Sequence, residues 1–234
     1  MDHREQRSRT ILIVDDEEHI LQMLLMNMRT QGYRGLTAMT GAEALTLAER
    51  ELPDLILLDV MLPDLDGVEI CRRLKANART GRIPVLMVSA KSESRDKING
   101  FQGGADDYIT KPFSLEELFL RIAAALRQVD LLTASPAEYR QGNLTLNTEK
   151  YQVLTEGHKI DLTLTEFRIL HLLLKNQGRL VTRELLAEEI FEMDPAESSR
   201  SLDVHLRNIR RKLEGNRVMG CDIETIRGQG YQIG

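Results

Sequence analysis

The sequence is poor in cysteine and has no long hydrophobic run. Its 234 residues include two cysteines, Cys71 and Cys221, and neither has a nearby partner at metal-ligand spacing. We therefore expect both thiols to be reduced and structural, as in a cytoplasmic protein. No apolar stretch approaches the roughly 18 residues that a bilayer-spanning helix requires, so we expect no membrane segment.

A strong charge of either sign is also lacking. The formal net charge is -5, with 42% hydrophobic and 29% charged residues, which is typical of a soluble globular protein. This balance argues against a protein that coats nucleic acid over its whole surface, although it permits a local basic face. Residues 1–9 are polar and charged and lack the apolar core of a signal peptide, so we expect a disordered tail.

The first half of the chain alternates between strand-like and helix-like patterns. Short apolar runs that end in turn residues are typical of buried parallel strands. We expect strands at residues 11–14, 35–38, 55–59, 83–88 and 106–109. Helices are expected between and after them at residues 18–31, 41–51, 67–76, 94–102 and 114–127. This order predicts a doubly wound, five-stranded parallel (βα)5 domain with helices on both faces of the sheet.

The second half has a different pattern, which is typical of an α+β domain. Short strands are expected at residues 144–146, 151–154 and 159–162, and a final hairpin at 223–226 and 231–233. Helices are expected at residues 165–176, 182–191 and 198–213. We therefore predict a tail at 1–9, a first domain at 10–127, a linker at 128–138 and a second domain at 139–234.

Three acids follow two of the predicted parallel strands. Asp15 and Asp16 follow the first strand, and Asp59 ends the third. Ligands bind at the carboxyl ends of strands in open α/β sheets, so these acids are expected to share one site. Three carboxylates would repel one another without a cation, and oxygen ligands in a site open to water and phosphate suit Mg²⁺.

Two further side chains complete a possible phosphoryl-transfer site. Ser89 closes the fourth strand, and Lys111 follows the fifth and precedes Pro112. A metal and a lysine would neutralise charge on the transferring oxygens, and Asp59 would act as the nucleophile that forms an acyl phosphate. Each residue alone has a simpler interpretation as a helix cap, a turn residue or a loop residue, but their combined placement is more specific.

The helix expected at residues 198–213 is basic on one side. It carries Arg200, His205, Arg207 and Arg210 beside an apolar stripe, whereas the chain as a whole is acidic. Such a local reversal of charge is the expected electrostatic footprint of a DNA-binding face. A solvated cationic helix is the alternative interpretation of the charge pattern.

The first half resembles the receiver domain of two-component response regulators. The resemblance lies in residues 11–16, 57–67 and 104–113. It implies that Asp59 accepts a phosphoryl group and that Mg²⁺ is bound by Asp15, Asp16, Asp59 and the backbone carbonyl of Met61. It further implies that Ser89 and Lys111 bind the phosphoryl group, and that Ser89 is coupled to Tyr108 in a conformational switch.

The second half resembles the winged-helix domain of the OmpR/PhoB type in residues 164–170, 204–213 and 226–231. The resemblance implies a recognition helix in the major groove and a wing at the minor groove. It implies DNA contacts by Arg200, His205, Arg207, Arg210, Thr225, Arg227 and Tyr231. Asn208 stands where many relatives carry arginine, so readout there is expected to differ. The acidic stretch 188–197 corresponds to a loop that in the family often meets RNA polymerase.

The family resemblance also implies a homodimer formed by the receiver. Two ion pairs of that interface are retained, namely Lys97 with Glu117 and Asp107 with Arg121. A third would need an acid at Gln102 and a base at Ala123, and neither is charged. Exposed pairs contribute only about 0 to 1 kcal/mol each, so the missing pair is expected to weaken or redirect dimerisation rather than abolish it. Apolar contact is expected from Ile98, Phe101, Leu118 and Ile122, and the alternative for some of them is packing in the receiver's own core.

Together these features predict a transcriptional regulator rather than an enzyme. A sensor histidine kinase would phosphorylate Asp59, the receiver would dimerise, and two winged helices would bind promoter DNA. Three alternatives are a regulator that works without phosphorylation, a phosphohydrolase with an aspartyl nucleophile, and an adaptor that does not bind DNA. The complete acid set argues against the first, and Met61 two residues after Asp59 argues against the second, where a second acid is usual.

Overall fold

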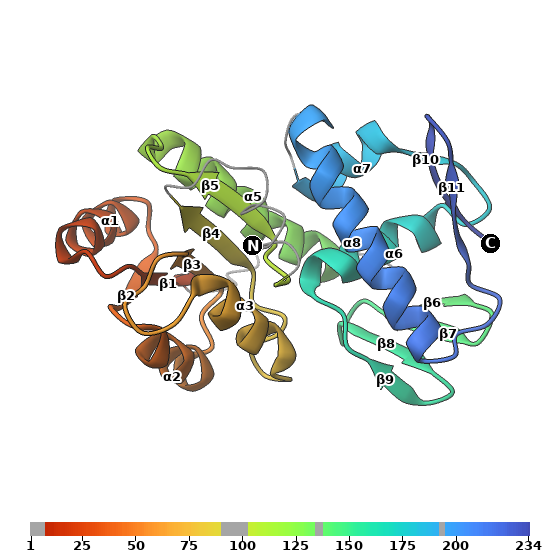
Figure 1. The fold of residues 1–234 in the computed structure, drawn as a ribbon, viewed down its shortest axis with the longest axis horizontal. Helices are drawn as coiled ribbons and strands as arrows, with labels where there is room; N and C mark the ends of the chain where they lie inside the picture. Colours follow the sequence, from red (N-terminus) through yellow and green to blue (C-terminus); the bar gives the residue numbers. More distant parts are fainter. Residues whose placement is uncertain (1–7, 90–102, 134–137, 192–194) are drawn as a thin grey trace, which may run out of the picture. The chain divides into compact units, whose positions relative to one another are not determined.

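The chain forms two compact units, Met1–Ile122 and Ala123–Gly234, in this computed structural model (Figure 1). The structure describes residues 8–89, 103–133, 138–191 and 195–234. In that part of the chain, no helix is both long and apolar enough to cross a membrane. Cys71 and Cys221 are free thiols with buried side chains, as expected from their separation in the sequence.

The first unit is built on a five-stranded parallel sheet in the order β2-β1-β3-β4-β5. Every residue of β1, β3 and β4 is buried, because both faces of the sheet are covered. Figure 1 shows helices on both sides of the sheet, with α2 and α3 next to each other. The strands are β1 (Thr10–Val14), β2 (Arg34–Ala38), β3 (Leu55–Asp59), β4 (Val85–Ser89) and β5 (Asp107–Thr110). The helices are α1 (Glu18–Thr30), α2 (Gly41–Glu51), α3 (Gly67–Ala76) and α5 (Leu115–Thr133).

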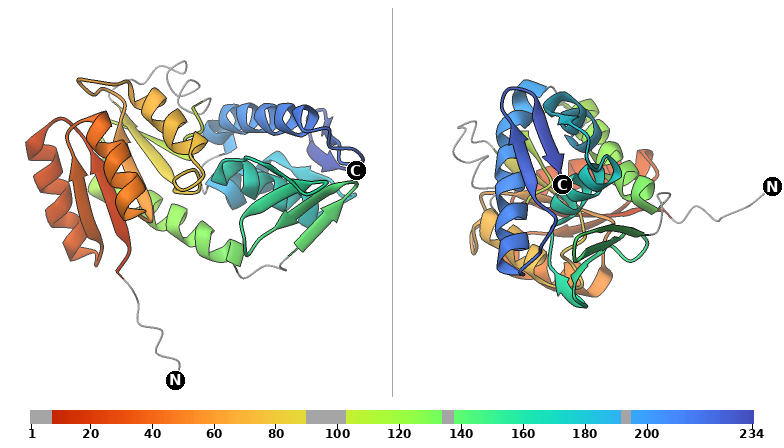
Figure 2. Two further views of the ribbon diagram at one scale, coloured as in Figure 1. Left: turned by 90° about the horizontal axis from the view of Figure 1, so that it is seen from below. Right: turned by 90° about the vertical axis from the view of Figure 1, so that its right-hand side faces the viewer.

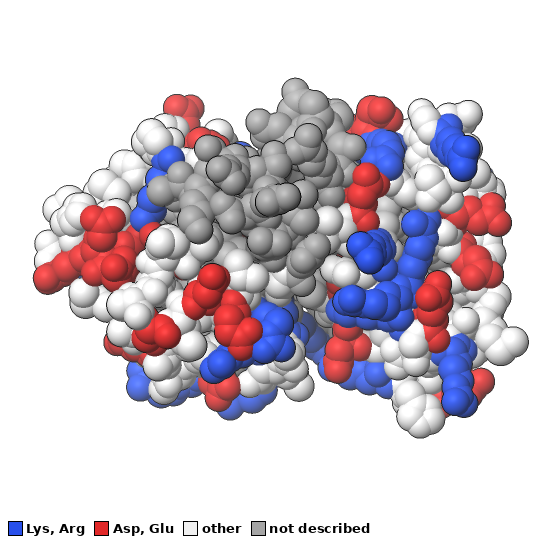
Figure 3. Space-filling model, viewed as in Figure 1, with Lys and Arg blue, Asp and Glu red and all other residues white. Residues whose placement is uncertain are grey.

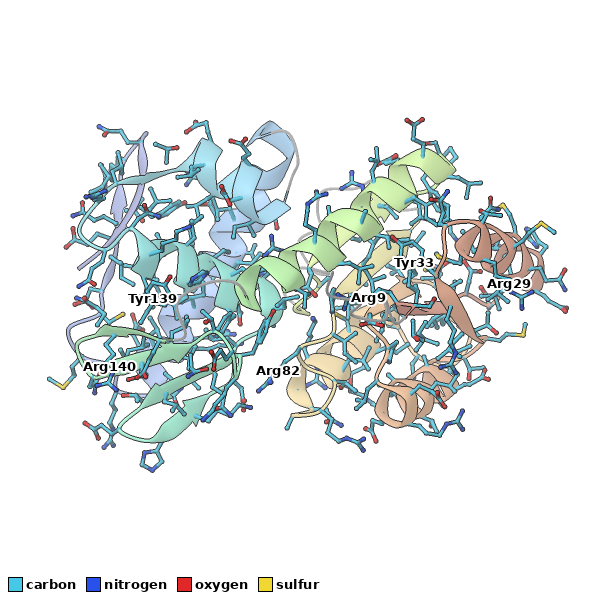
Figure 4. The ribbon with its side chains drawn as sticks, turned by 180° about the vertical axis from the view of Figure 1, so that it is seen from behind. Arg9, Arg29, Tyr33, Arg82, Tyr139 and Arg140 are labelled. Atoms are coloured by element: carbon cyan, nitrogen blue, oxygen red, sulfur yellow. The ribbon has the colours of Figure 1, made fainter. Side chains whose placement is uncertain are left out.

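This topology confirms the predicted receiver architecture, with small differences at the element ends. β4 begins two residues later than predicted, directly after Pro84, which has no N–H to donate. The helix predicted at residues 94–102 lies outside the described residues. Ser8 and Arg9 do not fit the predicted disordered tail, because the Ser8 hydroxyl donates to Gly32 O and Arg9 pairs with Asp54 at 2.9 Å (Figure 4). The rest of that predicted tail, residues 1–7, lies outside the described residues.

Helix α5 continues six residues beyond its predicted end at Arg127. No proline or glycine interrupts residues 128–133, so the sequence contains no signal that would stop the helix there. Within the second unit, the backbone carbonyl of Val129 accepts a 2.6 Å hydrogen bond from the Tyr151 hydroxyl, and the Val129 side chain packs on that unit's core. The predicted linker at 128–138 therefore starts too early, and of it residues 134–137 lie outside the described part.

In its described residues, the second unit contains two small sheets and three helices in addition to the end of α5. Figure 2 gives two further views of the ribbon. A four-stranded antiparallel sheet is formed by β6 (Glu138–Gln141), β7 (Leu144–Asn147), β8 (Gln152–Thr155) and β9 (His158–Ile160). The helices are α6 (Leu164–Lys175), α7 (Arg183–Phe191) and α8 (Pro195–Gly215). A three-stranded sheet is formed by β10 (Val181–Thr182), β12 (Gly230–Ile233) and β11 (Ile223–Ile226). Strands β6 and β10 were absent from the prediction.

Helix α6 lies at the centre of this unit's hydrophobic core. Its side chains Phe167 and Leu170 pack in one cluster with Leu206 and Ile209 of α8 and with Tyr231 of β12. A capping box starts the helix, in which Thr163 accepts from the Glu166 N–H and Glu166 accepts from the Thr163 N–H. The N–H groups of Thr163 and Glu166 therefore have hydrogen-bond partners although both residues are buried.

A buried histidine makes the stability of this unit dependent on pH. The His171 side chain is nearly inaccessible and contacts the ring of Tyr139, which β6 contributes (Figure 4), at 4.9 Å in a T-shaped arrangement. Burial lowers the pKa of His171 from 6.5 to about 4, with a smaller contribution from Lys175. Among the described residues, its Nε2 atom has no hydrogen-bond partner.

We expect acid to destabilise the second unit through this side chain. Between pH 6.5 and pH 4 the unfolded chain binds a proton at His171 that the folded chain does not, so stability falls as the pH drops. Lowering the pH from 7 to 5 should reduce the contribution of His171 to the free energy of unfolding by about 2 kcal/mol. The free energy of unfolding can be measured at both pH values by urea unfolding followed by NMR signals of the second unit. In His171→Phe its fall between pH 7 and pH 5 should be smaller than in the wild type by about 2 kcal/mol. The same substitution at exposed His158 should leave it unchanged.

Candidate functional site

The parallel sheet brings four of the predicted site residues to one edge. Strand β3 ends at Asp59 and β4 ends at Ser89, while Asp15 and Lys111 directly follow β1 and β5. Ser89 is in register with Thr110, and Asp59 with Val88, so all four strand ends meet at the carboxyl edge. This is the edge at which open α/β sheets bind ligands.

The ammonium group of Lys111 joins the two buried carboxylates. Its Nζ atom lies 2.8 Å from Oδ2 of Asp15 and 2.5 Å from Oδ2 of Asp59. The side chains of Asp15 and Asp59 are 5% and 8% exposed. One ammonium between two carboxylates leaves the cluster with a net negative charge, which favours a further cation.

The second oxygen of each carboxylate is held by the backbone. Oδ1 of Asp59 accepts from the Met61 N–H at 2.9 Å, and Oδ1 of Asp15 accepts from the Glu17 N–H at 2.9 Å. These bonds fix the orientation of both groups, because each oxygen has its own partner. The N-cap residue of α1 is Glu17, so Asp15 does not fit the simpler helix-cap interpretation of the acid pair.

Burial is the main influence on how Asp59 titrates. It raises the pKa of Asp59, and the neighbouring charge of Asp15 acts in the same direction, against hydrogen bonds from Lys111 and Met61. Burial alone would lower the pKa of Lys111, but its hydrogen bonds to the two carboxylates outweigh this and raise it. Lys111 therefore remains a cation beside the acids.

The backbone of Asp59 and Val60 leaves no room for a side chain at position 67, which is glycine. Helix α3 begins at Gly67, whose N–H donates to Val60 O at 2.9 Å. A Cβ atom at Gly67 would lie 2.5 Å from Asp59 O and 2.7 Å from the Cα of Val60, and both contacts are with rigid backbone. Glycine is required here so that the segment following Asp59 can fold back against the strand.

Ser89 and Tyr108 occupy the same face of the sheet. Tyr108 is in register with Met87, two residues before Ser89 on β4, so their side chains point the same way. Both residues are buried, Ser89 completely and Tyr108 to within 4%. The N–H of Lys111 donates to Ser89 O at 2.7 Å, and the following Lys111-Pro112 bond is cis.

The structure brings together only part of the predicted metal site. Asp16 is exposed, and Met61, whose backbone carbonyl was the predicted ligand, is 57% exposed and donates its N–H to Asp59. Within the described residues, no three acidic, histidine or cysteine side chains are arranged to hold a metal ion. The Lys111 ammonium balances one of the two negative charges of Asp15 and Asp59, which partly accounts for the closeness of these carboxylates. The oxygen-only donor set and residual negative charge nevertheless fit Mg²⁺.

The predicted dimer residues pair within one chain. Arg121 on α5 bonds Asp107 at 3.0 Å and Glu117 at 2.9 Å, so the predicted Asp107–Arg121 contact is intramolecular here. Leu118 and Ile122 are fully buried in the unit's own core, which contradicts their predicted role at an interface. The remaining predicted contacts, Lys97, Ile98 and Phe101, lie outside the described residues.

Helix α8 presents exposed arginines opposite a buried stripe. Leu202, Leu206, Ile209 and Leu213 are all buried, as the helical periodicity predicted, whereas Arg207 and Arg211 are exposed. Figure 3 shows lysine and arginine side chains gathered over α8 on the visible face of this unit. The side chain of Arg200, also predicted on this helix, lies outside the described residues.

Two predicted DNA contacts are contradicted by burial. His205 is completely buried on the apolar side of α8, and Tyr231 is 2% exposed within the core. The Tyr231 hydroxyl donates to Asp203 at 2.7 Å, which occupies its polar end. Neither side chain can reach a nucleic acid from these positions.

The remaining wing residues keep accessible positions. Thr225 on β11 and Arg227 at its end are exposed. Arg210 connects α8 to β11, because its guanidinium donates to Ile223 O at 3.0 Å and to the Thr225 hydroxyl at 2.8 Å. The predicted contacts Arg210 and Thr225 are therefore held together, with Arg210 partly buried, and Arg227 is exposed directly after β11.

Sequence reasoning missed one pair beside this surface. Arg183 at the start of α7 donates to Asp203 on α8 at 2.7 Å, and its guanidinium lies 5.1 Å from the centre of the Tyr231 ring. Arg183 and Asp203 are 20 residues apart, and no local pattern relates them. Of the predicted acidic stretch, Glu188 and Glu189 are exposed near the end of α7, and residues 192–194 lie outside the described part.

Comparisons with known proteins match both units. The family model "Response regulator receiver domain" matches residues 11–123, and "Transcriptional regulatory protein, C terminal" matches residues 157–233. The chain is 40% identical to the alkaline phosphatase synthesis transcriptional regulatory protein PhoP of Bacillus subtilis, over 97% of both chains. It is 35% identical to the phosphate regulon transcriptional regulatory protein PhoB of Rhizobium meliloti, over 95% of this chain and 97% of the relative.

Solved structures agree over nearly the whole length. A mutant of RitR superposes with a TM-score of 0.81 at 26% identity, covering 97% of this chain and 99% of that one. DrrB of Thermotoga maritima, described as an OmpR/PhoB homologue, gives a TM-score of 0.51 at 33% identity with the same coverage. The chain therefore belongs to the OmpR/PhoB family of two-component response regulators, in which a receiver domain and a C-terminal DNA-binding domain together control transcription.

Proposed function

We propose that this regulator is switched on when Asp59 accepts a phosphoryl group from a sensor histidine kinase. The observation that supports this most strongly is the bridge from Lys111 to the buried carboxylates of Asp15 and Asp59 at the carboxyl edge of the sheet. It keeps a nucleophilic oxygen, a second acid and a permanent cation within one small cluster. Both kinase and promoter would be met in the cytoplasm.

The proposed transfer breaks a P–N bond of the kinase and forms a P–O bond on Asp59. Oδ2 or Oδ1 of Asp59 attacks the phosphorus of the kinase phosphohistidine, the P–N bond breaks, and its electron pair stays on the imidazole, which then takes up a proton. The product is an acyl phosphate on Asp59, and the Lys111 ammonium pairs with its new negative charge. The Ser89 hydroxyl would donate a hydrogen bond to the same group.

Receiver domains generally bind Mg²⁺ at the phosphorylation site. In this chain Asp15, Asp16, Asp59 and the backbone carbonyl of Met61 would hold it, and the ion would neutralise charge on the transferring oxygens. Asp16 is exposed and directly follows the buried Asp15 in the sequence. The net negative charge of the cluster gives the physical reason for a divalent ion.

Phosphorylation would change the conformation of Ser89 and Tyr108, which lie on the same face of the sheet. Movement of the Ser89 hydroxyl towards the phosphoryl group would vacate space that the Tyr108 ring could enter. That change alters the surface formed by β5 and α5, where Asp107, Glu117 and Arg121 already form an ion-pair network. We propose that a homodimer forms there, with Lys97 joining Glu117 and with Asp107 and Arg121 exchanging partners between chains.

Dimerisation would bring two winged helices together on promoter DNA. Arg200, Arg207 and Arg210 of α8 would contact the major groove side, and Thr225 and Arg227 the wing side. Linking two modules raises affinity through effective concentration without any new contact to DNA. The exposed acids at the end of α7 would face RNA polymerase. The role proposed is regulatory rather than enzymatic.

A labelling experiment tests the central claim. Full-length protein is incubated with acetyl phosphate, with and without Mg²⁺, and the modified residue is identified by mass spectrometry after borohydride trapping. Labelling at Asp59 that requires Mg²⁺ is the expected result. Labelling elsewhere, or equal labelling without a divalent ion, would remove the proposed role of the acidic cluster.

A further inference from the structure

One acidic side chain outside the phosphoacceptor cluster ties that cluster's loop to a neighbouring helix. Asp64 lies in the segment 60–66 between β3 and α3. Its Oδ1 accepts from the Gly41 N–H at 2.8 Å and its Oδ2 from the Ala42 N–H at 3.0 Å. Both donors belong to the first turn of α2, so one carboxylate satisfies two N–H groups that have no partner within the helix.

Helix α2 already has an N-cap residue other than Asp64. Thr40 is the N-cap of α2, and its hydroxyl accepts from the Glu43 N–H at 3.2 Å. Asp64 therefore adds a contact between two segments that are distant in the sequence. The hydrogen bonds from the backbone N–H groups of Gly41 and Ala42 lower the pKa of Asp64. A negative charge is also favourable at the N-terminal end of a helix dipole.

The tethered loop is also fixed at its other end. The Met61 N–H donates to Asp59, and Val60 O accepts from the Gly67 N–H at 2.9 Å. The start of α2 packs tightly on the same loop, since a Cβ atom at Gly41 would lie 3.1 Å from the Cβ of Leu65. The backbone that orients the Asp59 carboxylate is thus held between strand β3 and helix α2.

We infer that Asp64 is a positioning residue for phosphoryl acceptance, a role that rests on the function proposed above. It keeps the segment 60–66 in the conformation that presents the Met61 backbone to Asp59 and the metal. Without Asp64 the segment keeps its hydrogen bonds at β3 and the packing of Leu65 on Gly41, but it loses both hydrogen bonds to the first turn of α2. The orientation of the Asp59 carboxylate and the position of the Met61 carbonyl would then vary, and metal binding would weaken.

Asp64→Ala should therefore weaken Mg²⁺ binding, measured by isothermal titration calorimetry without phosphodonor, and should raise the Mg²⁺ concentration that gives half-maximal labelling by acetyl phosphate. Outer partners of metal ligands typically change affinity or activity 10- to 100-fold, and an exposed tether should be near the lower limit, about tenfold. Asp64→Asn retains one carbonyl oxygen that accepts one N–H, so its Mg²⁺ requirement should lie between those of Asp64→Ala and the wild type. Labelling at saturating Mg²⁺ should approach that of the wild type.

Thr40→Ala is the matched control, because it removes a cap from the same helix but does not touch the loop. It should leave the Mg²⁺ requirement at the wild-type value. If Asp64→Ala has the wild-type requirement, or if both alanine variants shift it equally, Asp64 acts only on helix stability and the inference fails. If the wild type binds Mg²⁺ but is not labelled, the proposed function fails, whereas the calorimetric comparison of the wild type with Asp64→Ala still decides the inference, so the two failures are distinguishable.

Discussion

Replacement of Asp59 with asparagine is expected to abolish labelling by acetyl phosphate and the gain in DNA affinity that follows it. The amide retains an oxygen that can accept the Met61 N–H, so the local backbone should be preserved. It has no carboxylate to form an acyl phosphate. Phosphodonor should tighten binding of the wild type to a two-site DNA fragment by about 100-fold through linkage of the two modules, and should leave Asp59→Asn unchanged.

The matched control lies at the opposite edge of the same sheet. Asp54 precedes β3, pairs with Arg9 and accepts from the Thr10 N–H at 2.7 Å, so Asp54→Asn changes the same charge far from the acceptor cluster. This variant should be labelled and should dimerise like the wild type when followed by sedimentation. Phosphodonor-dependent dimerisation or tight DNA binding by Asp59→Asn would show that control does not pass through this residue.

Most of the receiver could be predicted because local and global signals agree there. Strands β1, β3 and β4 are buried on both faces and are therefore continuous apolar runs, which cannot be confused with exposed segments. Their ends coincide with the acids and the serine, so strand order alone brings Asp15, Asp59 and Ser89 to one edge. The bridge formed by Lys111 follows from the same topology.

The errors arose where partners are distant in the sequence. Strand β10 has two residues and exists because Val181 pairs with Tyr231, which no local pattern reveals. The contact of Asp64 with α2 likewise joins a loop to a helix more than 20 residues away. In-chain pairing of Arg121 could not be separated from pairing between chains, because both satisfy the same charges.

Two errors in the DNA-binding surface could have been avoided. His205 lies three residues after Leu202 and four before Ile209, so helical periodicity already assigns it to the apolar stripe. Tyr231 and Ile233 alternate with the partly exposed Gln232 along β12, which predicts burial of both. Position in a family motif suggested DNA contact for His205 and Tyr231, but local periodicity was the better guide to burial.

The exposed Arg207 offers the sharpest test of the DNA-binding surface. It lies on α8 next to the buried Leu206, so Arg207→Ala removes a charge without opening the core. A contact made by such a side chain is worth about 1 to 3 kcal/mol, or roughly 5- to 150-fold in affinity. We expect a loss in this range for a fragment selected from random DNA by the wild-type protein, measured by fluorescence anisotropy.

The dependence of binding on salt identifies the kind of contact. If Arg207 meets a phosphate, the slope of log affinity against log salt should decrease by about 1, and binding should weaken for all sequences. If it meets a base, the loss should be confined to the selected sequence. Arg140→Ala is the matched control, because Arg140 pairs with Glu138 on β6 in the four-stranded sheet, outside α8 and the wing (Figure 4). This variant removes the same charge and should have almost no effect on DNA binding. Equal behaviour of the two variants would exclude α8 as the surface that reads DNA.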